Sequence, residues 1–160
     1  MTTRELDAAR KRLTSAFLRA SELPEGALEL RSDYARYLCV LVSGFVEVAV
    51  FEMAAEHCRR RASPTVSNYG ISQLGKLQNI KCERLAQLLS SFDPSWRAAF
   101  EAFVGGPRSD ALDSAVDLRN KIAHGESVGL TLSRVTDYRD RIVEILDFVE
   151  ELFLPAEVHQ

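Results

Sequence analysis

The sequence predicts an all-α protein in which long helices pack antiparallel as a bundle. Apolar residues recur every three or four positions through several long segments, which is the spacing of one face of a helix. No segment reads as a confident strand, a repeat or a low-complexity tract. Short connections between the last helices imply that those helices are antiparallel neighbours.

Two helices are predicted in the N-terminal part of the chain. The first covers residues 3–21 and is followed by a Leu-Pro-Glu-Gly break. The second is expected to start at Ser32 or Asp33, either of which can cap a helix. It is expected to end at the arginine triplet 59–61, because basic residues in a last turn complement the helix dipole and Ser63-Pro64 follows.

The strongly apolar segment 37–55 lies within the second of these helices. Alternating valines at 46–50 also permit a strand, but the length of the run and its later Ala, Met and Glu residues favour a helix. A membrane span needs about 20 apolar residues. Here Glu47 and Glu52 would put costly carboxylates inside the bilayer. We therefore expect a nearly all-round buried central helix of a soluble bundle, and no membrane partner.

Further helices are predicted over residues 80–89, from Pro94 to 103, from Ser109 or Asp110 to about 123, and over 131–154. Asp93 before a proline is typical of a helix start, and Gly125 is typical of a helix stop. Residues 66–78 stay undecided between helix and loop, because their glycines weaken any helix. The long apolar helix, wrapped by the first and the last two helices, is the expected core.

Length and composition fit one domain over residues 1–160, with 46% hydrophobic and 27% charged residues. The formal net charge is -3, so the chain does not attract nucleic acid through its overall charge, and a local cluster must do so. The three cysteines form no paired metal-ligand motif, and no metal or cofactor is expected. The N-terminal residues lack the apolar region of a secretory signal, which predicts a cytoplasmic protein.

One short motif carries most of the functional information: Arg119-Asn120-Lys121-Ile122-Ala123-His124, followed by Gly125. An arginine five residues before a histidine is a weak signal in a chain with sixteen arginines and three histidines. The added asparagine, the glycine and the position at a helix end strengthen it. Two readings are open at this point: functional residues, or side chains that simply suit a helix end.

Together with the all-α pattern, this motif resembles that of the HEPN superfamily of small helical bundles, in which an arginine and a polar residue precede a histidine. The resemblance covers most of the chain, and the long apolar helix with its embedded Glu47 also looks like the family's. The resemblance to this family implies a metal-independent endoribonuclease of a toxin or defence type. Such proteins often act as homodimers or are paired with an antitoxin, such as a nucleotidyltransferase-type protein. Other members of the superfamily are catalytically inactive binding modules.

The chemistry of the motif agrees with RNA as substrate. Histidine can transfer protons near neutral pH, and arginine is a permanent donor for charge that builds on a phosphate. Asn120 can donate to a phosphate oxygen or fix the histidine ring. On an ideal helix Arg119 and His124 point about 140° apart, so one helix presents the pair poorly. Either a frayed last turn or two such helices across a dimer axis would bring them together, and the resemblance implies the second.

Supporting roles are expected for Lys121 and for Glu47 and Ser43, which lie one turn apart on the apolar helix. Glu47 either orients the motif or pairs structurally with an arginine. His57 next to Cys58 is not read as a metal pair. Besides the ribonuclease and the inactive binding module, a structural adaptor that uses the narrow apolar seam of the last helix for assembly is the third function class considered.

Overall fold

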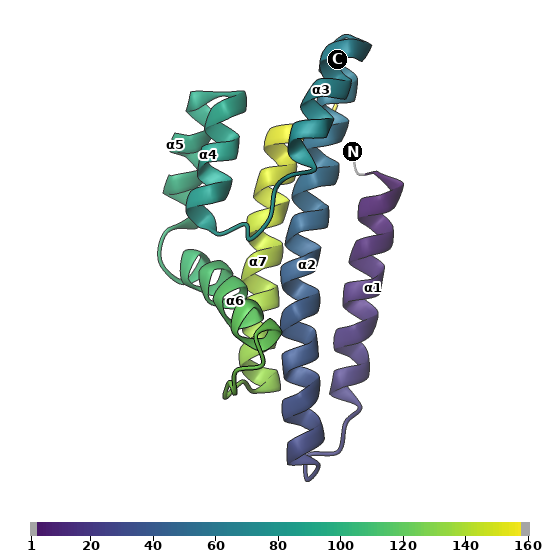
Figure 1. The fold of residues 1–160 in the computed structure, drawn as a ribbon, viewed down its shortest axis with the longest axis vertical. Helices are drawn as coiled ribbons and strands as arrows, with labels where there is room; N and C mark the ends of the chain where they lie inside the picture. Colours follow the sequence, from purple (N-terminus) through teal and green to yellow (C-terminus); the bar gives the residue numbers. More distant parts are fainter. Residues whose placement is uncertain (1–2, 158–160) are drawn as a thin grey trace.

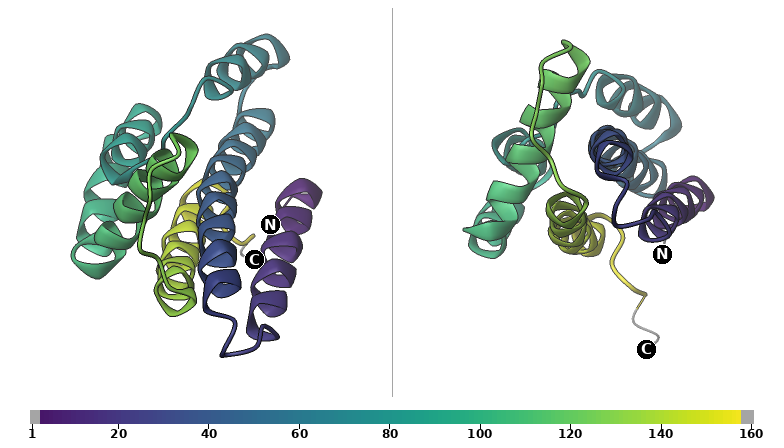
Figure 2. Two further views of the ribbon diagram at one scale, coloured as in Figure 1. Left: turned by 60° about the horizontal axis from the view of Figure 1, so that its bottom comes forward. Right: turned by 90° about the horizontal axis from the view of Figure 1, so that it is seen from below.

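Residues 3–157, the part of the chain that the computed structural model describes, form seven α-helices and no strand, which confirms the all-α prediction. The long helices α1, α2 and α7 lie side by side, α6 crosses them, and α4 and α5 form a hairpin at one side (Figures 1 and 2). The helices are α1 Arg4–Ser21, α2 Leu28–Arg61, α3 Pro64–Leu74, α4 Cys82–Phe92, α5 Pro94–Val104, α6 Pro107–Ala123 and α7 Leu132–Phe153.

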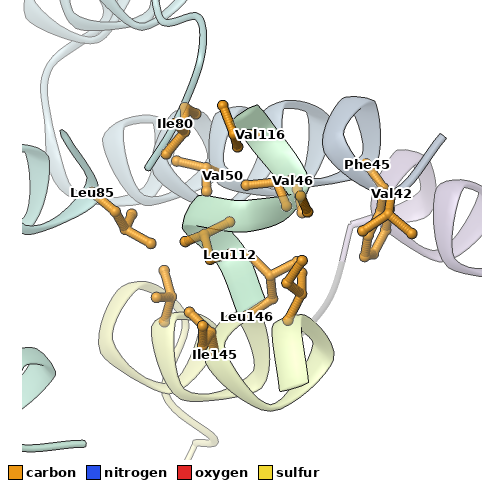
Figure 3. Packing of buried hydrophobic residues seen from close by; sticks show 14 of the residues in the cluster. Val42, Phe45, Val46, Val50, Ile80, Leu85, Leu112, Val116, Ile145 and Leu146 are labelled. Atoms are coloured by element: carbon orange, nitrogen blue, oxygen red, sulfur yellow. The ribbon is translucent and has the colours of Figure 1, made fainter. Parts of the chain in front are cut away.

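The core forms around α2, as the sequence predicts. Side chains of α2, α6 and α7 interdigitate at its centre, where Val46 and Val50 meet Leu112 and Val116 (Figure 3). By length and composition α2 could cross a membrane, but 61% of its most apolar window is buried inside this protein. Neighbouring helices therefore cover most of this apolar window.

One expectation about α2 is wrong, because the helix is not buried all round. Tyr37, Val40 and Val48 are 49%, 40% and 41% exposed, and Gly44 on the same side is also exposed. These residues lie at the 3- and 4-residue spacing of one helix face. The sequence did not indicate this exposed face, because the apolar run looks uniform. Which face of a helix stays exposed depends on where the other helices pack.

Two expected helix caps are also wrong. The turn after Pro24 starts α2 at Leu28, with Ala27 at the N-cap position and no side-chain cap, so Ser32 lies inside the helix. Likewise α6 starts at Pro107, before the expected caps Ser109 and Asp110. Proline suits a first helical position, because its missing N–H would have no partner there.

The other predicted boundaries agree with the structure to within a few residues. Asp93 accepts a hydrogen bond from the N–H of Ser95 at 2.8 Å, and Thr131 caps α7 through the N–H of Arg134 at 3.1 Å. The undecided segment forms α3, which begins at Pro64 directly after α2. Helix α3 packs on α2, and a Cβ on its Gly70 would meet the Cys58 Sγ at 3.3 Å.

His57 joins α2 to three other helices. Its Nδ1 donates to the carbonyl oxygen of Phe153 in the last turn of α7 at 2.8 Å, since a carbonyl can only accept. Its ring makes edge contacts with Phe92, Trp96 and Phe153, with centroid separations of 5.6, 5.5 and 5.7 Å. This ring cluster attaches the α4–α5 hairpin to the bundle and gives His57 a structural role.

Replacing His57 with alanine should destabilise the fold. The change removes one hydrogen bond and three ring contacts, so we expect the free energy of unfolding to fall by about 2 kcal/mol and the Tm by roughly 6 °C. His57→Phe keeps a ring but loses the hydrogen bond, and should fall between alanine and wild type. Thermal unfolding followed by circular dichroism measures both, and an alanine variant as stable as wild type would contradict this role.

Candidate functional site

The predicted motif lies in the last turns of α6 and directly after it. Arg119, Asn120 and Lys121 belong to the helix, whereas His124 occupies the C-cap position with φ -87° and ψ 6°. Helix α6 is held against the N-terminal half of α2, where the Cys39 Sγ donates to the carbonyl oxygen of Ala115 at 3.5 Å. The motif therefore emerges at the side of α2, at the lower end of α6 in Figure 1.

The helix stop at Gly125 is a Schellman motif. The N–H of Gly125 donates to the carbonyl of Ile122 at 3.0 Å, and the N–H of Glu126 donates to the carbonyl of Lys121 at 3.0 Å. Gly125 has φ +76°, in the left-handed region that a residue with a Cβ adopts at a cost. These hydrogen bonds give the last carbonyl groups of α6 their partners and fix the helix end. His124 therefore has a defined backbone position.

Arg119 and Asn120 are in direct contact. The Arg119 Nη1 donates to the Asn120 Oδ1 at 3.2 Å, and both side chains are half-buried. The contact occupies the amide oxygen and leaves the amide NH2 group as a donor. Arg119 keeps further guanidinium N–H groups for an anion. The structure thus brings together two of the three predicted catalytic residues as a pair of donors.

His124 and Lys121 are exposed, in contrast to this half-buried pair. Among residues 3–157, no hydrogen bond or ion pair joins the His124 ring to Arg119 or Asn120. The imidazole is therefore free to reach a ligand, and one chain presents the Arg119–Asn120 pair and His124 as separate parts.

Glu47 is half-exposed and accepts a hydrogen bond from the backbone N–H of Asn79 at 3.1 Å. Asn79 lies in the connection between α3 and α4, so Glu47 binds a connecting segment instead of a side chain of the motif. In the described part of the chain no hydrogen bond links Glu47 to Arg119 or His124. Ser43, one turn earlier, is buried at 3% exposure. A role of either residue in orienting the motif stays a prediction.

Two aspartates on α6 were missed by sequence reasoning, although they position the motif helix. Asp113 accepts from the N–H of Cys82 at 2.8 Å, and Asp117 forms an ion pair with Lys81 that raises the pKa of the lysine. They attach α6 to the start of α4 and to the same connecting segment that Glu47 binds. Their four-residue spacing indicates that they share one face of α6. The sequence does not indicate which residues they contact.

Two of the three cysteines, Cys39 and Cys82, are buried. Burial raises the pKa of Cys39 and of Cys82 to about 11, so these thiols stay protonated near neutral pH. Within residues 3–157 no three or more His, Cys, Asp or Glu side chains gather as a metal site would need. His159 lies outside the described residues.

Gly125→Ala should destabilise the helix end without a steric clash. A Cβ at Gly125 would meet nothing within 4 Å, so the cost comes from the positive φ alone, about 1 kcal/mol of unfolding free energy. Gly129→Ala is the matched control, because that site is equally open and lacks a positive φ. Urea unfolding compares the two, and an equal loss in both variants would argue against the left-handed constraint.

The comparisons with known proteins agree with this arrangement. The chain matches the sequence model of the family described as RiboL-PSP-HEPN over residues 6–154, which span all seven helices apart from the first two residues of α1. Neither the search of curated proteins nor the search of solved structures found a match. The match covers far more than half of the sequence and includes the motif on α6. The chain therefore belongs to the RiboL-PSP-HEPN family and carries a HEPN-type helical domain.

Proposed function

We propose that this protein is a metal-independent endoribonuclease of a toxin or defence type, which cleaves RNA phosphodiester bonds at a site shared by two copies of the chain. The observation that carries the proposal is the motif at the exposed end of α6, where Arg119 and Asn120 form a donor pair and His124 stands free. Membership of a HEPN family supports it.

The proposed reaction uses the ribose 2′-hydroxyl as nucleophile. Its oxygen bonds to the adjacent phosphorus as the bond from phosphorus to the 5′-oxygen breaks, which leaves a 2′,3′-cyclic phosphate and a 5′-hydroxyl. An imidazole accepts the 2′-hydroxyl proton, and a protonated imidazole can donate one to the departing 5′-oxygen. Arg119, Asn120 and Lys121 would stabilise the charge that builds on the phosphate oxygens.

The site of one chain is incomplete for this chemistry. His124 makes no side-chain contact with the Arg119–Asn120 pair among the described residues. Two motif ends beside a two-fold axis would bring the His124 of one chain to the Arg119–Asn120 pair of the other and double the local positive charge. Such a local cluster also suits a chain whose net charge is -3. An antitoxin, for instance a nucleotidyltransferase-type protein, would then act by masking this cleft.

A catalytically inactive binding module is the second candidate. The observation that favours it is that Arg119 and Asn120 form their donor pair with no contact to His124 among the described residues, so the pair can hold an anion without the imidazole. In that case the same donor pair would hold a protein or nucleotide partner without cleaving it. The distinction depends on whether His124 is needed for bond breaking or only for binding.

Purified wild-type protein should cleave RNA in excess EDTA, and the products should carry a 2′,3′-cyclic phosphate or its hydrolysis product. His124→Ala and Arg119→Ala should each lower the cleavage rate by about 10²- to 10⁴-fold, because each removes proton transfer or transition-state charge stabilisation. Electrophoresis of end-labelled RNA measures the rate. Loss of cleavage on chelation alone would refute the metal-free mechanism.

Arg84→Ala serves as the control for these variants. Arg84 is an exposed arginine on α4, outside the motif helix, so it tests the effect of removing one cation. Its cleavage rate should stay close to that of wild type. If the wild type binds RNA but never cleaves it, and Arg119→Ala weakens that binding while Arg84→Ala does not, the inactive module is the better description.

Mixing His124→Ala chains with Arg119→Ala chains tests the shared site. If one chain supplies the arginine and its partner the histidine, each mixed dimer regains one intact site of two. With random exchange, activity should recover to about a quarter of the wild-type value. If each site takes both residues from one chain, every mixed dimer stays inactive and the shared site is wrong. Exchange is confirmed by native mass spectrometry of the mixture.

A further inference from the structure

A hollow between α1 and the N-terminal half of α2 gathers cationic side chains and is here called the α1–α2 hollow. It has a volume of about 420 Å³ and is lined by Lys11, Arg12, Ser15, Arg19, Tyr37 and Leu41. Within the described residues, no carboxylate lines it. In a chain whose net charge is -3, a local cluster of this kind is the feature that attracts a polyanion.

The cations of the α1–α2 hollow have no acidic partner. All three are exposed, and none of them forms an ion pair with a carboxylate among residues 3–157. Other arginines of the bundle are paired, as Arg97 is with Glu83 at 2.9 Å and Arg108 is with Glu144 at 2.7 Å. The positive charge of the hollow is therefore available to a ligand.

An aromatic ring stands on the α2 side of the hollow. Tyr37 is 49% exposed, and the ring of Tyr34 contacts it edge to face with a centroid separation of 5.4 Å. Tyr34 in turn donates its hydroxyl to the carbonyl oxygen of Ala16 on α1 at 3.2 Å. The Arg19 guanidinium lies beside both tyrosines, and hydrogen bonding to the Tyr34 hydroxyl is the main cause that raises the pKa of Arg19. The exposed ring of Tyr37 is thus held in place next to a cation.

The hollow and the motif flank the same turns of α2. Cys39 contacts Ala115 on α6, the helix that carries the motif, whereas Tyr37 lines the hollow on the side of α1. On an ideal helix Val40 lies about 100° from Cys39 and about 60° from Tyr37. Since Val40 is 40% exposed, open surface connects the two sides across one helix.

This connecting surface is apolar. Val40, Gly44 and Val48 line a groove of about 280 Å³ that adjoins the hollow and shares Arg12 and Tyr37 with it. A Cβ at Gly44 would meet nothing within 4 Å, so space is open above the glycine. Nucleic-acid bases have flat apolar faces, which such a surface can cover when the bases are unpaired.

The opposite end of the groove is acidic. Beyond Val48, the half-buried Glu52 lies close to Glu5 of α1, and burial together with this neighbouring charge raises the pKa of Glu52. Two carboxylates so close together repel phosphate groups. A polyanion that enters the hollow is therefore directed over Val40 toward the motif, rather than along the groove toward Glu52.

We propose that the α1–α2 hollow holds single-stranded RNA next to the cleavage site on α6. The inference rests on the proposed function and adds to it the surface outside the motif that binds the substrate. Lys11, Arg12 and Arg19 would contact phosphates, and a base would stack on Tyr37. A cationic groove combined with an aromatic ring suits single strands, because an unpaired base exposes the face that stacks.

Removal of two cations tests the phosphate contacts. The probe is a fluorescent single-stranded 2′-O-methyl oligonucleotide, which lacks the nucleophile and is not cleaved. The variant Lys11→Ala/Arg12→Ala should bind it about 10-fold more weakly near ~0.1 M salt. The slope of log affinity against log salt should fall by about 1.4, because each phosphate contact on a single strand contributes about 0.7. Fluorescence anisotropy measures both. A wild type that does not bind the strand, or an unchanged slope in the variant, would overturn the proposal.

The double variant Lys76→Ala/Arg84→Ala is the matched control. It also removes one lysine and one arginine, both exposed, from a hollow that contains the 68% exposed Tyr69. That hollow lies between α3 and α4, away from the lower end of α6 in Figure 1. Its affinity and salt slope should stay close to those of wild type. Equal losses in the two double variants would mean that the strand binds any positive surface, against a site in the α1–α2 hollow.

Replacement of Tyr37 tests the stacking and the choice of RNA over an acidic protein. Tyr37→Ala should weaken binding of the same strand about 10-fold at an unchanged salt slope, because stacking is not ionic. Tyr37→Phe keeps the ring and should bind like wild type. Polyglutamate has negative charge without bases and should displace the strand poorly. Normal binding by Tyr37→Ala, or displacement by polyglutamate as efficient as by unlabelled RNA, would make an acidic protein segment the better occupant and the RNA assignment wrong.

A dinucleotide separates the hollow from the cleavage site. It has one phosphodiester, which the motif would take, so Lys11→Ala/Arg12→Ala should cleave it as fast as wild type does. On a longer single strand the same variant should raise KM about 10-fold and leave kcat unchanged, because only binding is lost. A lower kcat on both substrates would show that the variant disturbs the motif, against a role confined to binding.

The two proposals fail in different ways. If wild-type protein binds the 2′-O-methyl strand through the hollow but cleaves no RNA in any buffer, the ribonuclease assignment fails and the RNA-binding surface stands. If it cleaves RNA and Lys11→Ala/Arg12→Ala binds the strand as tightly as wild type, the surface fails and the ribonuclease assignment stands.

Discussion

The structure depends on the need to cover one apolar helix of 34 residues. Helix α2 supplies buried side chains from Ala35 to Ala55, and α1, α3, α6 and α7 all pack directly against it. Burial of apolar surface is the main favourable term in folding, so the helices are ordered by how they cover α2. The ion pairs of Arg10 with Asp147 and Glu150, between α1 and α7, add orientation to that packing.

This packing also positions the site. Helix α6 holds the motif in a fixed position because its apolar face packs on α2 and α7. Asp113 and Asp117 also attach α6 to the start of α4 and the connection before it. The same packing leaves one side of α2 open.

Much of the fold could be predicted because the signals are local. Proline at the start of α5 and glycine after α6 act within one helical turn, and their positions were predicted correctly. The caps expected for α2 and α6 were wrong for a local reason as well. A turn at Pro24 and a proline at position 107 start these helices earlier than the polar residues chosen as caps.

The sequence by itself determined the helical class, the order of the helices and the motif Arg119-Asn120-His124 at a helix end. These follow from residue spacing and from hydrogen bonds between near neighbours in the chain. Only the tertiary structure decided that Glu47 binds the backbone of Asn79, that His57 joins four helices, and that one face of α2 stays open. Each of these depends on residues distant in sequence, whose meeting is set by packing of the whole chain.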